Sequence, residues 1–360
     1  MTEAGQSAQT FHIETAGRGW RAAAAGATAV FLVLLALPVF AGRNLIQDLI
    51  FLFYMLALAQ CWNLLAGYAG LISVGQQAFV GLGGYILFAL AQLGGIDPLL
   101  AIPFAGVVSA AFALPTALIV FRLRGAYFAI GTWVVAEVYR LVFAQFKDLG
   151  GGTGTSLAPS ATSAVSGIEW VKTLFDVRTP AARDIISYWV ALLLVTGTLA
   201  FVYLILRSRR GLALGAIRDR EEAAAGLGVD IYRIKLAVYV ATAAMTGMIG
   251  ALIYLQKARI SPDAAFSVLD WTAYVIFIVV IGGVRTIEGP MIGVLTLWGL
   301  INYLAQYGSL YLIVLGTIAI LVMLFMPKGV WGEIAGRWGI RLFPTQRVLS
   351  RNSCRSDLVK

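Results

Sequence analysis

The sequence predicts an all-α polytopic membrane protein with about ten transmembrane helices and both termini in the cytoplasm. Hydrophobic residues make up 60% of the 360 residues and charged residues only 12%, whereas a soluble domain carries about 25% charged residues. Apolar runs of about 20 residues, long enough to cross a bilayer, recur along the chain. The net charge of +9 is concentrated between these runs, as in cytoplasmic loops, so it does not predict a nucleic-acid partner.

We predict ten spans separated by turn-like joins such as "GGIDP" and "GGVRTIEGP". They cover residues 22–41, 45–66, 76–93, 98–120, 126–146, 185–206, 235–256, 267–283, 289–306 and 308–326. The first run ends in "LPVFAG" and superficially resembles a cleaved signal peptide. Because it is about 20 residues long and further spans follow, we interpret it as an uncleaved span.

Basic residues set the orientation of these spans. Arg122 and Arg124 occupy one short loop, and seven more basic residues lie between 207 and 235. With ten spans these loops share one side with both termini, and the positive-inside rule makes that side cytoplasmic. We therefore predict cytoplasmic tails at 1–21 and 327–360, a membrane domain at 22–326, an outer segment at 147–184 and a cytoplasmic loop at 207–235.

Glycines within the spans predict that helices approach each other closely. Gly247 with Gly250, and Gly289 with Gly293, place small residues one turn apart on a helix face. Ordinary tight packing is the simplest interpretation of each.

A short charged segment, "RDREEAAAGLGVDIYRIK" (218–235), stands between two spans. Asp219 followed by Glu222 resembles a capping box, and Gly226 or Gly228 supplies a helix stop. The alanines between them, 223–225, leave one helix face almost without side chains. Such a face suits insertion into a groove of another protein. The pattern alone also fits a solvated helix or a basic patch against lipid headgroups.

Few residues could perform chemistry. Cys61 and Cys354 are far apart in the chain and His12 is the only histidine, so the sequence predicts no metal site, no cofactor and no hydrolytic triad. The "GGTGTS" stretch at 151–156 lacks the lysine of a phosphate-binding loop. Any ATP that drives this protein would have to bind to another polypeptide.

Polar residues within the spans are candidates for a translocation pathway. Glu137 and Arg140 are three residues apart and share a helix face, either as a structural pair or as part of the pathway. Four more polar residues surround a predicted helix break at 67–75, where irregular backbone would have to face protein or water. They are Asn63, Ser73, Gln76 and Gln77. Hydrogen bonding between helices is the alternative role for these four.

The motif Glu222-Ala223-Ala224-x-x-x-Gly228 resembles the E-A-A-x-x-x-G signature of ABC importer permeases. Five blocks occur in the order seen in the branched-chain amino acid ABC transporter permease family, and they look most like the longer of its two paired subunits. They are "GYAGLISVGQQAFVGLGGY" (67–85), "RLRGAYFAIGTWVVAEVYRLV" (122–142), "SRRGLALGAIRDREEAAAGLGVDIYRIKL" (208–236), "ISPDAAFS" (260–267) and "VVIGGVRTIEGPMIGV" (279–294). The resemblance covers about 45–330.

This resemblance implies an ABC importer permease fold in a bacterial inner membrane. The implied partners are a second permease subunit, two ATP-binding subunits and a periplasmic substrate-binding protein. It further implies that Asp219, Glu222, Ala223, Ala224 and Gly228 form a coupling helix that sits in a groove of the ATP-hydrolysing subunit.

Leucine, isoleucine and valine are the expected substrates, and urea, short amides or other small solutes are alternatives within the family. An ion-coupled secondary transporter or channel is the rival from another class. It would use buried ionisable groups or a selectivity ring, and it gives no reason for the alanine-rich helix. No paired catalytic residues predict an intramembrane enzyme.

Overall fold

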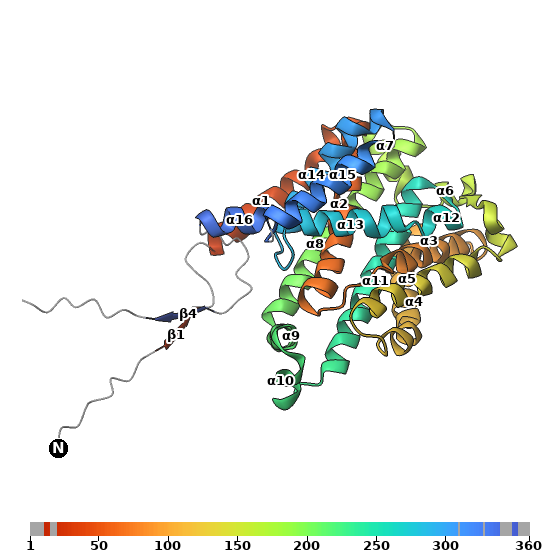
Figure 1. Ribbon diagram of the computed structural model, residues 1–360. Coiled ribbons are helices and arrows are strands. Elements are labelled where there is room, and N and C mark those ends of the chain that lie inside the picture. Colours follow the sequence, from red (N-terminus) through yellow and green to blue (C-terminus); the bar gives the residue numbers. More distant parts are fainter. Residues whose placement is uncertain (1–10, 15–19, 309, 327, 339–347, 352–360) are drawn as a thin grey trace, which may run out of the picture.

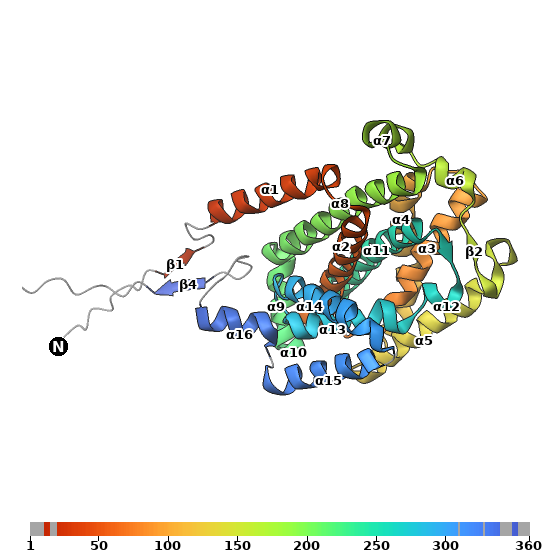
Figure 2. The same cartoon turned by 90° about the horizontal axis from the view of Figure 1, so that it is seen from above.

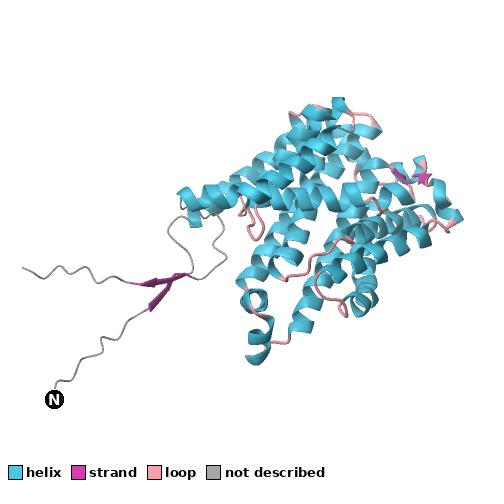
Figure 3. Ribbon diagram, viewed as in Figure 1, coloured by secondary structure: helices cyan, strands magenta, loops and turns pink. Residues whose placement is uncertain are grey.

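The computed structural model describes residues 11–14, 20–308, 310–326, 328–338 and 348–351 (Figure 1). These residues are almost entirely helical, and the few strands are short (Figure 3). The longer helices are α1 (Trp20–Ala36), α2 (Arg43–Asn63), α3 (Gln76–Gln92), α4 (Pro98–Val120), α5 (Ala126–Phe143), α8 (Thr179–Arg207), α11 (Ile231–Lys257), α14 (Gly289–Leu304) and α15 (Leu310–Phe325).

Shorter helices connect or extend them. They are α6 (Pro159–Ser163), α7 (Ile168–Phe175), α9 (Arg209–Asp219), α10 (Glu221–Gly226), α12 (Pro262–Ala265), α13 (Tyr274–Gly282) and α16 (Gly329–Trp338). Single turns are η1 (Leu37–Val39), η3 (Lys147–Leu149), η4 (Gly151–Thr153) and η6 (Ala305–Tyr307), with π-helical turns η2 (Leu64–Tyr68) and η5 (Leu269–Ala273). The strands pair as β1 (Phe11–Glu14) with β4 (Val348–Arg351), and β2 (Thr155–Ser156) with β3 (Arg259–Ile260), both antiparallel.

Seven helices within the described residues are long and apolar enough to cross a membrane, judged by length and composition. They span Arg43–Tyr68, Pro98–Val120, Ala126–Phe143, Thr179–Arg207, Ile231–Lys257, Pro262–Gly282 and Leu310–Arg337. Thr28–Val39 and Gly289–Leu304 form shorter apolar helices. Sixteen-residue α14 is about 24 Å long at 1.5 Å per residue, less than the roughly 30 Å hydrocarbon core. The seven long apolar helices confirm a polytopic membrane fold. The count of ten spans and the cytoplasmic position of both termini remain predictions.

The core forms around α11. This helix packs against α3 and α4 along one side and also contacts α2 and α8, while α13 packs against α14 (Figure 2). Helix α2 contributes an unbroken run of buried residues from Ala57 to Asn63. Polar residues near its end are therefore held within the protein.

Two sets of glycines make this packing possible. A Cβ atom on Gly83 of α3 would collide with the backbone of Gly247 on α11, and one on Gly250 would collide with the backbone of Val80. A Cβ on Gly293 of α14 would strike the carbonyl oxygen of Ile278 on α13. The predicted close approach of helices at Gly247, Gly250 and Gly293 is confirmed.

Contacts at helix ends and between loops join segments that the charge pattern placed on the same side. At the predicted outer side, Arg43 pairs with Asp184 (Nε to Oδ2, 2.7 Å) and the β2–β3 pair ties the 147–184 segment to the loop after α11. At the opposite side, Tyr68 donates to the carbonyl oxygen of Arg285 (2.6 Å). Figure 1 shows α7 at the top of the bundle and α10 at the bottom.

Helix boundaries follow the predictions closely where proline or glycine marks them. Helix α4 covers the predicted 98–120, with Asp97 capping Leu99 (2.9 Å). The predicted break at 67–75 also occurs: α2 continues as π-helical η2 to Tyr68, irregular backbone follows, and α3 begins at Gln76. Helix α8 begins at Thr179, six residues before the predicted 185, with a proline in its first turn. Much of the predicted tails lies outside the described residues.

Candidate functional site

The loop between α8 and α11 folds into two helices. Ser208 caps α9, because its Oγ accepts from the backbone N–H of Arg210 (3.2 Å). Arg220 adopts an extended conformation between Asp219, the last residue of α9, and Glu221, the first of α10. The loop is thus a helix–corner–helix unit at one end of the bundle (Figure 1).

The predicted capping box at Asp219 is wrong. Residue 220 is the N-cap of α10, and no side chain caps that helix. The carboxylate of Asp219 instead accepts from the guanidinium of Arg218 at 2.8 and 3.0 Å. The charged neighbour outcompetes the helix N–H groups for this carboxylate, because hydrogen bonds between two ions are stronger than those to a neutral amide.

Gly228 ends α10, and this part of the prediction is confirmed. Its φ of +81° is a left-handed conformation that favours glycine. The Gly228 N–H donates to the carbonyl of Ala225 (3.0 Å), and the Val229 N–H donates to that of Ala224 (3.1 Å). This pair of bonds is the Schellman motif. It returns the chain sharply towards Asp230, which caps α11.

The alanine-rich face of α10 is divided between inside and outside. Ala224 is only 1% exposed, so it packs within this chain, whereas Glu222 and Ala223 are exposed. Leu227, just after the helix, is 81% exposed. The exposed apolar face of this unit is therefore centred on Ala223 and Leu227. The sequence did not lead us to predict a role for Leu227, although it is an apolar residue inside an otherwise charged loop.

An ion pair joins α10 to α11. The Nζ of Lys235 contacts the carboxylate of Glu221, and Arg233 pairs with Asp230 at 3.0 Å. A displacement of α10 would therefore pull on the start of α11, the central helix of the bundle. The α9–α10 unit is thus connected to the first turn of α11.

The four polar residues around the helix break are all buried and hydrogen-bonded. Asn63 is fully buried: its Nδ2 donates to the carbonyl of Thr286 (2.8 Å), and its Oδ1 accepts from the N–H of Arg285 (2.9 Å). Gln60, missed by the sequence reasoning, donates to the carbonyl of Ile287 (2.6 Å). These two side chains attach the loop between α13 and α14 to the end of α2.

Ser73, Gln76 and Gln77 hold the start of α3. The Oγ of Ser73 accepts from the N–H of Gly75 (3.2 Å), and the Nε2 of Gln76 donates to the carbonyl of Leu58 (3.0 Å). The Oε1 of Gln77 accepts from the hydroxyl of Thr272. Among the described residues, the buried Gln76 Oε1 and Gln77 Nε2 have no hydrogen-bond partner. The structure brings these residues together with Asn63 around one break, and their role in a pathway stays a prediction.

Glu137 and Arg140 form the predicted ion pair, with Glu137 Oε1 at 2.9 Å from Nε and 2.5 Å from one terminal nitrogen of Arg140. The other terminal nitrogen of Arg140 contacts Asp263 at 2.6 Å. Asp263, in the "ISPDAAFS" block, received no role in the sequence reasoning. Two carboxylates therefore share one guanidinium, and the cluster carries a net negative charge.

The side chain of Glu137 lies within an exposed apolar stripe of α5. Its neighbours at helical spacing are Ile130, Val134, Val138 and Leu141, each about half exposed. Only 17% of the apolar window of α5 is buried within this chain. A carboxylate 45% exposed in this stripe would be costly against lipid tails.

In the described part of the chain, no three His, Cys, Asp or Glu residues cluster with ligand geometry. Cys61 is buried in α2, and Cys354 lies outside the described residues.

Comparison with known proteins decides the family. A family profile described as "Branched-chain amino acid transport system / permease component" matches residues 44–324. The chain belongs to this family. The family is one of transport permeases, not of enzymes, and the match spans the helical bundle, the α8–α11 loop and the helix break.

Individual relatives of this branched-chain amino acid permease are distant. The "High-affinity branched-chain amino acid transport system permease protein LivM" of Salmonella typhimurium is 28% identical over 312 residues, which is 84% of this chain and 73% of the relative. LivM of Escherichia coli matches to the same extent. A "Probable branched-chain amino acid transport permease protein LivH" of Methanocaldococcus jannaschii is 24% identical over 273 residues, 71% of this chain and 82% of the relative. No solved structure matched the chain.

Proposed function

We propose that this permease is the membrane-spanning subunit of an ABC importer that carries leucine, isoleucine and valine across the bacterial inner membrane. Separate ATP-binding subunits supply the energy, and a periplasmic binding protein delivers the substrate. The family match and the two LivM relatives support the substrate class.

The observation that carries the mechanism is the exposed tip of the α9–α10 unit. Ala223 and Leu227 are apolar and exposed there, and Glu222 adds charge beside them. None of the described residues covers exposed Leu227, so a groove on an ATP-binding subunit is the fitting partner. When the ATP-binding subunits close, α10 moves and the Glu221–Lys235 contact transmits the movement to α11. The bundle then shifts between outward- and inward-open states.

Uptake of labelled leucine by cells with and without the gene, with labelled urea in parallel, tests the substrate. Leu227→Asp and Ala223→Arg test the link to ATP. Both change the exposed tip, so leucine uptake should fall at least about tenfold, which 1.4 kcal/mol of lost contact energy produces. Membrane insertion should be unchanged. Ala224→Arg is less informative, because Ala224 is buried and its replacement would disrupt the loop itself.

Leu93→Asp is the matched control. Leu93 is 64% exposed and ends α3 at the predicted outer side, away from the ATP-binding subunits. Leucine uptake by the Leu93→Asp variant should stay close to that of the wild type. Normal uptake by the Leu227→Asp variant would refute the coupling role of α10, while loss of urea uptake alone would keep the architecture and change the substrate.

The exposed stripe of α5 is the contact surface that we propose for the second permease subunit. Glu137 interrupts that stripe, and a protein partner or an aqueous pathway at the subunit boundary accommodates this carboxylate better than lipid does. The likeness to both LivM and LivH supports a paired arrangement. In that arrangement Glu137, Arg140 and Asp263 stand at the outer end of the boundary, where a substrate's ammonium group would meet a net negative charge.

A further inference from the structure

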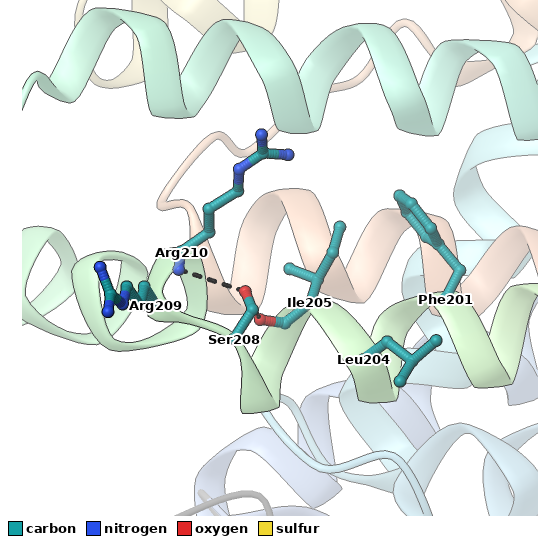
Figure 4. A pocket seen from close by; sticks show the side chains of 6 residues that line it. All are labelled: Phe201, Leu204, Ile205, Ser208, Arg209 and Arg210. Atoms are coloured by element: carbon teal, nitrogen blue, oxygen red, sulfur yellow. Dashed lines mark hydrogen bonds between the residues drawn. The ribbon is translucent and has the colours of Figure 1, made fainter.

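A pocket of about 430 Å³ lies where α8 passes into α9 (Figure 4). Six residues line it: Phe201, Leu204, Ile205, Ser208, Arg209 and Arg210. One wall is apolar and comes from the last turns of α8, and the other is basic and comes from the first turn of α9. Figure 4 shows Phe201, Ile205 and Arg210 projecting to the same side.

The two arginines have no acidic partner. Within the described chain, no carboxylate lies in ion-pair contact with Arg209 or Arg210, and both are exposed. Their neighbours in the loop differ, because Arg218 pairs with Asp219 and Arg233 with Asp230. Two adjacent unpaired guanidinium groups attract an anion, and a phosphate accepts their parallel N–H groups well.

The apolar wall of the pocket indicates which class of anion binds there. Phe201 lies about 9 Å deeper along the helix than Arg207, at 1.5 Å per residue, and Leu204 is 65% exposed. Since α8 is apolar enough to span the membrane, these side chains stand at the depth of acyl chains and the arginines at the depth of headgroups. Arginines at the cytoplasmic end of a span attract anionic lipids. A free phosphate would have no use for the apolar wall.

We propose that this pocket binds an anionic phospholipid of the cytoplasmic leaflet, with its phosphate at the basic wall of Arg209 and Arg210 and an acyl chain along Phe201 and Ile205, which project to the same side as Arg210. The pocket adjoins the α9–α10 unit, so a bound lipid would hold the first turn of α9 at the membrane surface. The inference depends on α8 spanning the membrane with α9 on the cytoplasmic side, and it is independent of which substrate is carried.

Binding of fluorescent phosphatidylglycerol to the purified full-length chain in neutral detergent tests the proposal. The double variant Arg209→Gln/Arg210→Gln should bind about thirtyfold more weakly, since each basic residue near the headgroups contributes about 1 kcal/mol. The matched control is Arg122→Gln/Arg124→Gln, which removes two exposed arginines on the same predicted side but outside the pocket. Because Arg122 and Arg124 do not line the pocket, this variant should keep most of the affinity.

Two further measurements distinguish a phospholipid from a free phosphate as the ligand. Phosphatidylcholine should bind weakly to the wild-type protein and to the pocket variant. Soluble glycerol phosphate should not displace the fluorescent lipid. Equal loss of affinity in the pocket variant and the control would overturn the site, as would displacement by glycerol phosphate. If the pocket variant lost leucine uptake while its lipid affinity was unchanged, the arginines would be a protein contact and the lipid proposal would be wrong.

Discussion

Asn63 uses both ends of its amide, and this decides what its replacement should do. The Asn63→Leu variant keeps the volume but leaves the N–H of Arg285 and the carbonyl of Thr286 without the bonds they make to this side chain. Both hydrogen bonds are part-buried, and each such bond contributes about 0.5–1.5 kcal/mol, so the free energy of unfolding should fall by roughly 1–3 kcal/mol. Thermal unfolding in detergent measures this.

Gln306→Leu is the control for that experiment, because Gln306 is exposed and its amide nitrogen donates to the nearby carbonyl of Tyr303 on its own helix end. Its thermal midpoint should hardly change. A normal midpoint for Asn63→Leu together with lost uptake would transfer Asn63 from a structural role to the pathway.

Replacing Glu137 should have the opposite effect, lowering uptake more than stability. In Glu137→Gln, Arg140 keeps Asp263 as a partner, and a half-exposed ion pair contributes about 1 kcal/mol or less to stability. If the cluster faces the pathway, leucine uptake should fall severalfold while the thermal midpoint moves by only about 2–4 °C. Asp263→Asn should have a smaller effect on uptake, because Asp263 is more exposed than Glu137. A lower midpoint with unchanged uptake would make the pair structural.

At the scale of the elements, helix α14 offers a test within one helix. A Cβ on Gly293 would collide with the backbone of Ile278, while one on Gly299 would meet nothing within 4 Å. Gly299→Ala should therefore stabilise the helix by up to about 1 kcal/mol. Gly293→Ala should separate α14 from α13 and lower the yield of folded protein, measured by gel filtration in detergent. Equal behaviour of the two variants would contradict the close packing.

The sequence predicted most of these elements because membrane helices are read from hydropathy and their ends from proline and glycine. Pro98 and Gly228 mark boundaries that the structure confirms. Contacts between distant residues were less predictable. Asp219 was assigned to a cap because the motif spacing fits, but a neighbouring guanidinium holds its carboxylate. Asp263 and Gln60 gained their places only when the chain brought segments more than a hundred residues apart together.

At the scale of the whole molecule, burial differs sharply among the helices. Most of α2 is buried within the chain, with 78% of its apolar window covered, whereas α5 has 17%. Exposed helices face either lipid or protein, and apolarity alone does not distinguish the two. The difference lies in Glu137 and Arg140, since a charged pair at half exposure is stable only where protein or water surrounds it.

That distinction predicts how assembly changes the surface of α5. A nitroxide spin label on Val134→Cys, in the stripe beside Glu137, should collide freely with oxygen dissolved in the bilayer when the chain is alone. Its collision rate should fall severalfold once the second permease subunit is co-expressed, because that subunit replaces lipid around the label. A label on Val107→Cys of α4, which is 69% exposed, is expected to be unaffected. If the Val107 label responds and the Val134 label does not, the subunit boundary lies on α4, and the Glu137–Arg140–Asp263 cluster needs another explanation for its exposed carboxylates.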